Sequence, residues 1–226
     1  MTAGTAKTEA FCSWSGGKDC CIALFRALQS GIPVKHLLNM SSEDAYRSRT
    51  HGIESSWLRL QSNALGIPLV QKSASWDAYE DNFKVMLREF YTRGIRTGIF
   101  GDIDLEGHRE WVERVCGECG ITPVLPLWNA DRIGLIGEFI KQGFRAVVVS
   151  VDSRYLSNRW LGKEIDEDFL KEICLTDSID ICGEKGEYHT FVFDGPLFER
   201  PVLLEKSVHV LREGNWLLRL NGSQNG

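Results

Sequence analysis

The residues best suited to chemistry lie in the segment Ser15-Gly16-Gly17-Lys18-Asp19. Two adjacent glycines let a backbone approach an anion closely and turn its N–H groups toward it. The N-terminus of a following helix adds partial positive charge, and the Lys18 ammonium adds a full one. The segment is therefore predicted to hold the phosphates of a nucleotide.

The flanking sequence supplies the elements that would position this loop. Residues 11–14 (FCSW) are expected to form a buried strand, and residues 20–28 (CCIALFRAL) carry apolar side chains at helical spacing. The loop differs from GxxxxGK[ST], because no Ser or Thr follows Lys18. It also differs from GxGxxG, because its glycines are adjacent. A phosphate loop of another kind is indicated.

A second unusual segment spans residues 183–190 (GEKGEYHT). Its glycines, Gly183 and Gly186, suggest that the backbone comes close to another group. Glu184 and Glu187 have the chemistry to hold Mg²⁺ through water, to bind an amine or to accept a proton. From composition alone, a solvated turn that enters a strand is an equally good interpretation.

Short apolar runs alternate with helical patterns along the first half of the chain. Strands are expected at 34–40, 67–70, 97–100 and 122–124, and helices at 50–65, 76–93 and 106–119. This alternation predicts a parallel sheet covered by helices, with ligands at the carboxyl ends of its strands. Three segments follow such ends and are expected to share one site: residues 15–19, residues 39–42 and Gly101-Asp102.

The pattern breaks around Pro126 and Trp128, which predicts a boundary between domains at residues 1–128 and 129–226. Beyond it, helices are expected at 133–142 and 166–174, and strands at 146–151 and 188–193. Residues 201–211 and 216–220 are expected to form a hairpin. The second half is therefore predicted to be a smaller α+β domain.

Composition limits the classes of function. The chain has 226 residues, of which 43% are hydrophobic, and a formal net charge of -5. It can bury a full core, and its mild acidity argues against nucleic acid as a partner. No apolar run of about 18 residues or signal core occurs, so a cytoplasmic protein without a membrane partner is expected. Reduced thiols are expected, with Cys116 and Cys119 in the core and not on zinc.

These segments together resemble a known family. The loop SGGKD is similar to the PP-loop of ATP pyrophosphatases, SGGKDS, with Cys20 in place of the serine. Residues 183–190 are similar to GEGGEYET, the signature of the diphthine–ammonia ligase family, with Lys185 replacing a glycine and His189 a glutamate. Further stretches follow in that family's order: LGIPL at 65–69, FGDI at 100–103, VC at 115–116, PLW at 126–128, LG at 161–162 and DGPLF at 194–198.

The resemblance implies a Rossmann-like (HUP) PP-loop domain followed by a smaller α+β domain, and it implies an activity. Members of that family amidate a carboxylate on a modified histidine of elongation factor 2. ATP activates the carboxylate as an acyl adenylate with release of pyrophosphate, and ammonia then displaces AMP. The implied cofactors and partners are ATP, Mg²⁺, ammonia and elongation factor 2. Whether the protein forms a homodimer is left open.

The resemblance also implies roles for individual residues. Nucleotide binding is expected at Ser15, Gly16, Gly17, Lys18, Asp19, Cys20, Asn39, Met40, Gly101 and Asp102, with Asp19 and Asp102 near the metal. Substrate contacts are expected at Gly183, Glu184, Gly186, Glu187, Tyr188 and Thr190. Lys18, Asp19, Glu184 and Glu187 are the candidate catalytic residues.

Two alternatives stay open, and the replacements at Lys185 and His189 motivate the first of them. The same chemistry on a different carboxylate or nucleophile is one, and a non-catalytic sensor of ATP or AMP is the other. A tRNA-thiolating enzyme is a weaker variant, since it would need a basic surface and a well-placed cysteine pair. Neither is evident in the sequence.

Overall fold

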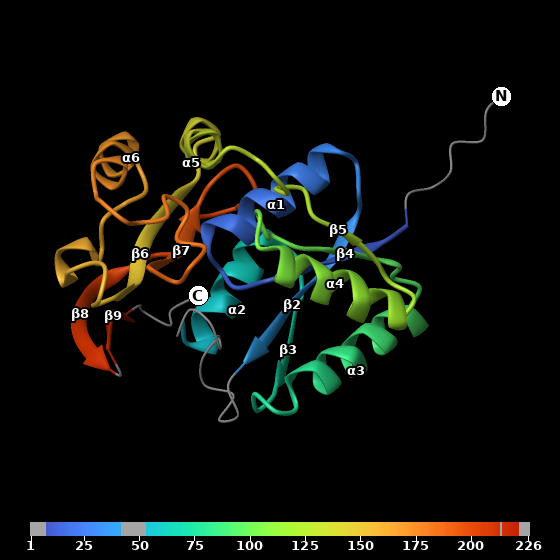
Figure 1. The fold of residues 1–226 in the computed structure, drawn as a ribbon. Coiled ribbons are helices and arrows are strands. Elements are labelled where there is room, and N and C mark those ends of the chain that lie inside the picture. Colours follow the sequence, from blue (N-terminus) through green and yellow to red (C-terminus); the bar gives the residue numbers. More distant parts are fainter. Residues whose placement is uncertain (1–7, 42–52, 213, 222–226) are drawn as a thin grey trace.

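The computed structural model describes residues 8–41, 53–212 and 214–221, which form two sheets with helices (Figure 1). The first sheet has the order β3-β2-β1-β4-β5, and its neighbouring strands are all parallel. Its strands are β1 (Ala10–Ser13), β2 (Val34–Ser41), β3 (Leu69–Ser73), β4 (Thr97–Ile99) and β5 (Thr122–Val124). They are connected by α1 (Lys18–Gln29), α2 (Ser55–Leu65), α3 (Tyr79–Thr92) and α4 (Glu106–Glu118). The predicted parallel sheet is confirmed.

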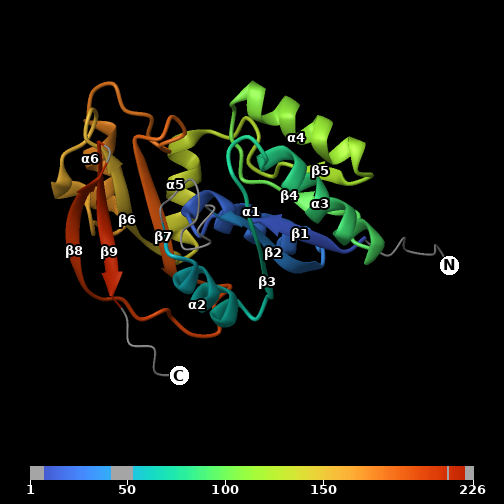
Figure 2. The same ribbon diagram turned by 90° about the horizontal axis from the view of Figure 1, so that it is seen from below.

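The side chains of β1 point alternately to the two faces of this sheet, and helices cover both faces. Successive side chains of a strand point to opposite faces. Ala10 and Cys12 pack in a core with α1 and α2, whereas Phe11 packs with Phe83 and Phe90 of α3 in a second core. Helices α3 and α4 therefore lie on one face of the sheet, and α1 lies between the sheet and the second half of the chain (Figure 2).

The second sheet is antiparallel and has the order β7-β6-β9-β8. Its strands are β6 (Arg145–Asp152), β7 (Tyr188–Asp194), β8 (Glu205–Arg212) and β9 (Asn215–Asn221). The same half of the chain contains three helices: α5 (Arg132–Lys141), the 3-10 helix η1 (Asn158–Trp160) and α6 (Glu167–Cys174). The predicted α+β half is confirmed, and its core joins that of α1 and β1.

Two expected strands begin later than predicted, for reasons that lie in the backbone. The strand expected from residue 67 begins at Leu69, because the Ile67 N–H still donates to the Ser62 carbonyl of α2 at 3.2 Å. The strand expected from residue 201 begins at Glu205. Before it, the Val202 N–H donates to the Phe193 carbonyl at 2.7 Å and ties this segment to β7.

Several expectations concern residues outside the described ranges. The helix expected from residue 50 begins at Ser55, because Glu54 has an extended backbone, and residues 50–52 are not described. Of the segment 39–42, the last residue is not described. Within the described ranges, no helix combines the length and the apolar character needed to cross a bilayer. All seven cysteines are free thiols, and Cys116 and Cys119 are buried as expected.

Candidate active site

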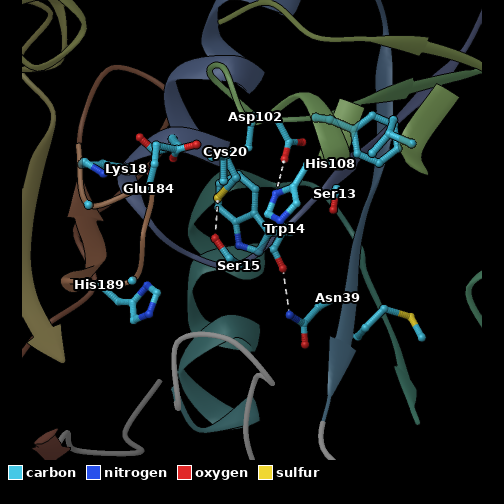
Figure 3. Close-up of a pocket in the computed structure, with 18 of the residues that line it drawn as sticks. Ser13, Trp14, Ser15, Lys18, Cys20, Asn39, Asp102, His108, Glu184 and His189 are labelled. Carbon is cyan, nitrogen blue, oxygen red and sulfur yellow. Dashed lines mark hydrogen bonds and ion pairs between the residues drawn. The ribbon is translucent and has the colours of Figure 1, made fainter. Parts of the chain in front are cut away.

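A cavity of about 450 Å³ opens at the carboxyl ends of β1, β2 and β4 (Figure 3). Its volume is in the range typical of small-molecule sites. The predicted residues that line it are Ser15, Lys18, Asp19, Cys20, Asn39, Met40, Gly101, Asp102, Gly183, Glu184, Gly186, Tyr188 and Thr190. The segments that the sequence singled out thus meet at one place. Gly16, Gly17 and Glu187 do not line the cavity.

The two loop glycines nevertheless shape the site from behind. Gly16 has a φ of +83°, and a Cβ there would lie 2.6 Å from Leu58 Cδ2 and 2.7 Å from Gln61 Oε1. The position therefore requires glycine both for its backbone conformation and for packing against α2. A Cβ at Gly101 would lie 2.9 Å from the carbonyl carbon of Asp19, so the end of β4 touches the start of α1.

Lys18 is the only Lys or Arg among the described residues that line the cavity, and only 5% of it is exposed. Its Nζ donates to Asp19 Oδ2 at 2.9 Å and to the carbonyl of Cys182. The same nitrogen lies 5.1 Å from the centroid of the Tyr188 ring. Burial alone lowers the pKa of Lys18, but Asp19 and the other partners raise it above its usual value. The ammonium therefore stays charged.

Strand β7 braces the phosphate loop from the second half of the chain. Thr190 Oγ1 accepts the backbone N–H of Lys18 at 3.0 Å, at the first turn of α1. Two residues later, the Val192 N–H donates to the carbonyl of Gly16 at 3.0 Å. Thr190, which was predicted to contact the substrate, caps the first turn of α1 in the structure.

Gln61 of α2 holds the same loop, a role that was not predicted from the sequence. Its side chain is fully buried. Its Nε2 donates to the carbonyls of Gly16 at 2.9 Å and Val192 at 2.6 Å, and its Oε1 accepts from Trp14 Nε1 at 3.0 Å. The available signal was one polar side chain on the apolar face of a predicted helix, which is too weak to assign a role.

The two glutamates of residues 183–190 have different surroundings. Glu184 lines the cavity on the same side as Lys18 (Figure 3). Burial raises the pKa of Glu184 to about 7, and the charge of Asp19 adds to this effect. Glu187 is 1% exposed, and its oxygens accept the backbone N–H groups of Asp180 at 3.0 Å and Lys185 at 3.1 Å. Glu187 therefore supports the loop from within, whereas Glu184 can meet a ligand.

Tyr188 and Cys20 line the cavity with polar atoms that already have partners. The Tyr188 hydroxyl donates to the Ile181 carbonyl at 2.6 Å. The Cys20 thiol donates to the carbonyl of Gly17 at 3.1 Å and accepts from Ser15 Oγ at 3.5 Å. Burial raises the pKa of Cys20, which keeps it a neutral thiol. Its hydrogen bonds thus stay within the phosphate loop.

The two departures from the family signature also differ in position. His189 lines the cavity, whereas Lys185 is exposed and does not. Burial lowers the pKa of His189 to about 4, with a further contribution from Lys18, so its imidazole is neutral at physiological pH. Only the His189 departure therefore changes the inner surface of the site.

One wall of the cavity was not predicted. It consists of aromatic side chains around α3 and α4: Trp76, Tyr79, Phe83, Phe100 and Trp111. The Tyr79 and Trp111 ring centroids lie 5.9 Å apart. Such rings can stack on a nucleobase.

Asn39 of β2 also lines the cavity. Its side chain donates to the carbonyl of Trp14, the residue after β1, at 2.8 Å and so connects these two strands.

The carboxylates fit the requirements of a phosphate-bound Mg²⁺. Asp19 and Asp102 line the same cavity; the first pairs with Lys18, and Asp102 Oδ1 lies 3.3 Å from His108 Nδ1. The contact with Asp102 raises the pKa of His108, another lining residue that the sequence did not suggest. Among the described residues no group of three metal-ligating side chains occurs. Two carboxylates are sufficient, because Mg²⁺ commonly takes its other ligands from phosphate and water.

The chain is similar to proteins of known name. A family model described as the diphthamide synthase N-terminal domain matches residues 7–123, and one described as the diphthamide synthase C-terminal domain matches residues 131–218. A diphthine–ammonia ligase of Danio rerio is 28% identical over 87% of this chain and 86% of its own length. That of Homo sapiens is 26% identical over 89% of this chain and 84% of its own. A longer Schizosaccharomyces pombe protein with the same name is 28% identical, over 84% of this chain and 35% of its own length.

Proposed function

The chain belongs to the diphthamide synthase family, and on that premise we propose that it is an ATP-dependent ligase that forms an amide from a carboxylate and ammonia. The names of its relatives support diphthine as the carboxylate. The family resemblance supports elongation factor 2 as its carrier and the cytoplasm as its location. The observation that carries the proposal is that the phosphate loop and residues 183–190 line the same cavity.

The first half-reaction makes an acyl adenylate. The carboxylate oxygen bonds to the α-phosphorus of ATP while the bond from that phosphorus to pyrophosphate breaks. Negative charge grows on the departing pyrophosphate and must be stabilised. The Lys18 ammonium and the N-terminus of α1 are the groups of this chain that meet that charge. Asp19 and Asp102 would hold Mg²⁺, which when bound neutralises the phosphates and orients the α-phosphorus.

The second half-reaction forms the amide. The nitrogen of ammonia bonds to the acyl carbon, and the bond from that carbon to AMP breaks. We assign Glu184 to accept a proton from the nitrogen, because this acidic residue lines the cavity. Its pKa of about 7 suits proton transfer near neutral pH. The aromatic wall would limit access of water to the reactive adenylate.

The direct test combines the protein with ATP, Mg²⁺, ammonium and elongation factor 2 that carries diphthine. AMP, pyrophosphate and amide are expected in equal amounts, whereas ADP and phosphate would contradict the proposal. Lys18→Met is expected to lower the rate by about 100-fold or more, because it removes the cation that meets the leaving group. The matched control is Lys35→Met, at a half-exposed site on β2, and should keep full activity.

A second candidate is the same chemistry on a different carboxylate. It is favoured by His189, which puts a neutral ring into the cavity where the family signature has a glutamate. Pyrophosphate release with another carboxylate, and none with diphthine, would support this candidate. ATP binding without pyrophosphate release for any carboxylate would instead indicate a sensor.

A further inference from the structure

Arg132, the first residue of α5, joins two loops that border the cavity. Its Nη1 lies 2.7 Å from Asp104 Oδ2 and its Nη2 2.9 Å from Asp104 Oδ1, in the loop that follows β4. Its Nε donates to Asp180 Oδ1 at 3.0 Å, and its Nη2 lies 3.0 Å from Asp180 Oδ2. One guanidinium thus holds two carboxylates from different halves of the chain.

The contact with Asp180 continues to Lys18. Asp180 Oδ1 accepts the backbone N–H of Cys182 at 2.8 Å, and the carbonyl of Cys182 accepts from Lys18 Nζ. The thiol of Cys182 donates to the carbonyl of Arg132 at 3.6 Å. Cys182, whose carbonyl receives the Lys18 ammonium, is therefore fixed at its N–H by Asp180 and at its thiol by the carbonyl of Arg132. The Arg132 side chain acts on the first of these contacts through Asp180.

We call the contacts of Arg132 with Asp104 and Asp180 the Arg132 bridge, and their geometry requires an arginine. Only 5% of the Asp180 side chain is exposed, so removal of its cation would leave a buried carboxylate without its counter-charge. A guanidinium carries donors in a planar fork that can serve two carboxylates together, whereas an ammonium is a point charge. Lysine at residue 132 could not reproduce the four contacts.

We propose that Arg132 is a positioning residue that acts through Asp180 and Cys182 to fix the Lys18 ammonium for its contact with the phosphates of ATP. The inference rests on the proposed function, because it takes Lys18 to be the phosphate-binding cation. It assigns the bridge a role beyond joining the two halves of the chain, and this distinction can be measured.

Arg26 provides the matched control. It donates to the carbonyl of Pro126 at 2.9 Å and to Glu138 Oε1 of α5 at 3.2 Å, so it also connects α1 with the second half. The exposed fractions of the two arginine side chains are similar, 31% and 33%. Arg26, however, makes none of the contacts that lead to Lys18.

The first experiment measures ATP affinity by calorimetry in two backgrounds. Arg132→Met is expected to weaken ATP binding about 10-fold in the otherwise unchanged protein. In a Lys18→Met background it should weaken binding less than about 2-fold further, since the residue through which it acts is gone. Arg132→Lys should show the same pattern with a smaller loss, and it serves if the methionine variant does not fold. Arg26→Met should leave affinity unchanged.

A second readout needs no nucleotide. The ¹⁵N resonance of the Lys18 ammonium is expected to shift in Arg132→Met and to stay in place in Arg26→Met. An unchanged resonance, or an equal loss of ATP affinity with and without Lys18, would overturn the inference. A protein that bound no ATP would contradict the proposed function alone, because the resonance would still report on Arg132.

Discussion

The residues of this site divide into those that face the cavity and those that hold the others in place. Glu184 and Glu187 illustrate the division, because they lie three positions apart and only Glu184 lines the cavity, whereas Glu187 is buried. Thr190 and Gln61 hold the phosphate loop by its backbone. Substitutions of the two kinds should therefore affect different measurements.

Gly16→Ala should reduce stability through strain at the loop. The residue has a φ of +83°, and the new Cβ would lie 2.6 Å from Leu58 Cδ2. We expect a loss of about 2–4 kcal/mol in the free energy of unfolding, measured by urea denaturation. Gly117→Ala, on α4 with no atom within 4 Å of the new Cβ, should be neutral or stabilising by up to about 1 kcal/mol. Equal effects at the two sites would contradict this explanation.

We expect His189 to make the free energy of unfolding depend on pH between about 4 and 6.5. Its pKa is lowered to about 4 in the folded protein from 6.5, chiefly by burial. Between these values the unfolded chain binds more protons, so stability should fall as the pH decreases from 6.5 to 4. His189→Gln should lessen this fall by on the order of 1–3 kcal/mol.

The same series of denaturation curves should be recorded for His209→Gln. His209 lies exposed on β8, away from the cavity. A pH dependence that changed equally in both variants would show that His189 is not the group responsible.

Sequence alone could not separate Glu184 from Glu187. Both are acidic residues in one glycine-rich turn, and no local periodicity distinguishes them. The difference arises from two backbone N–H groups that receive the Glu187 carboxylate. The sequence predicted candidates for the chemistry, whereas the orientation of their side chains depends on tertiary contacts.

At the scale of elements, Gln61 makes α2 part of the phosphate site. Gln61→Leu keeps a side chain of similar size but leaves Trp14 Nε1 and the carbonyls of Gly16 and Val192 without this partner. We expect a loss of about 2–4 kcal/mol in unfolding free energy and weaker ATP binding. Urea denaturation and calorimetry measure both quantities.

The control for this variant is Asn63→Ala, at an exposed position on the same helix. Its free energy of unfolding should stay within about 0.5 kcal/mol of the original. If Gln61→Leu behaved like this control, the three hydrogen bonds would not contribute to the stability of the loop.

Most helices and strands could be predicted because their apolar periodicity is strong. The strand at 122–124 was predicted at its observed bounds, and the helix expected at 106–119 ends one residue earlier. The Arg132 bridge could not be predicted, because its partners lie 28 and 48 positions away along the chain. Ion pairs of this kind depend on how two loops meet and leave no local pattern.

At the scale of the whole molecule, we propose that the boundary near residue 128 separates two parts that unfold together. One core contains Leu24 of α1, Cys12 of β1 and Phe191 of β7. Amide hydrogen exchange of β1 and β6 should therefore report the same free energy of opening, measured by mass spectrometry. A markedly lower value for one of the two strands would show that the halves unfold independently.

The hydrogen bond between Thr190 and the first turn of α1 also has a consequence for the order in which the chain is synthesised. The two bonded residues are 172 positions apart, and Lys18 is synthesised first. At ordinary rates of translation, about 10–30 s pass before the ribosome adds the strand that completes the loop. Growing chains that do not yet contain β7 therefore carry the phosphate loop without the hydrogen bond from Lys18 to Thr190.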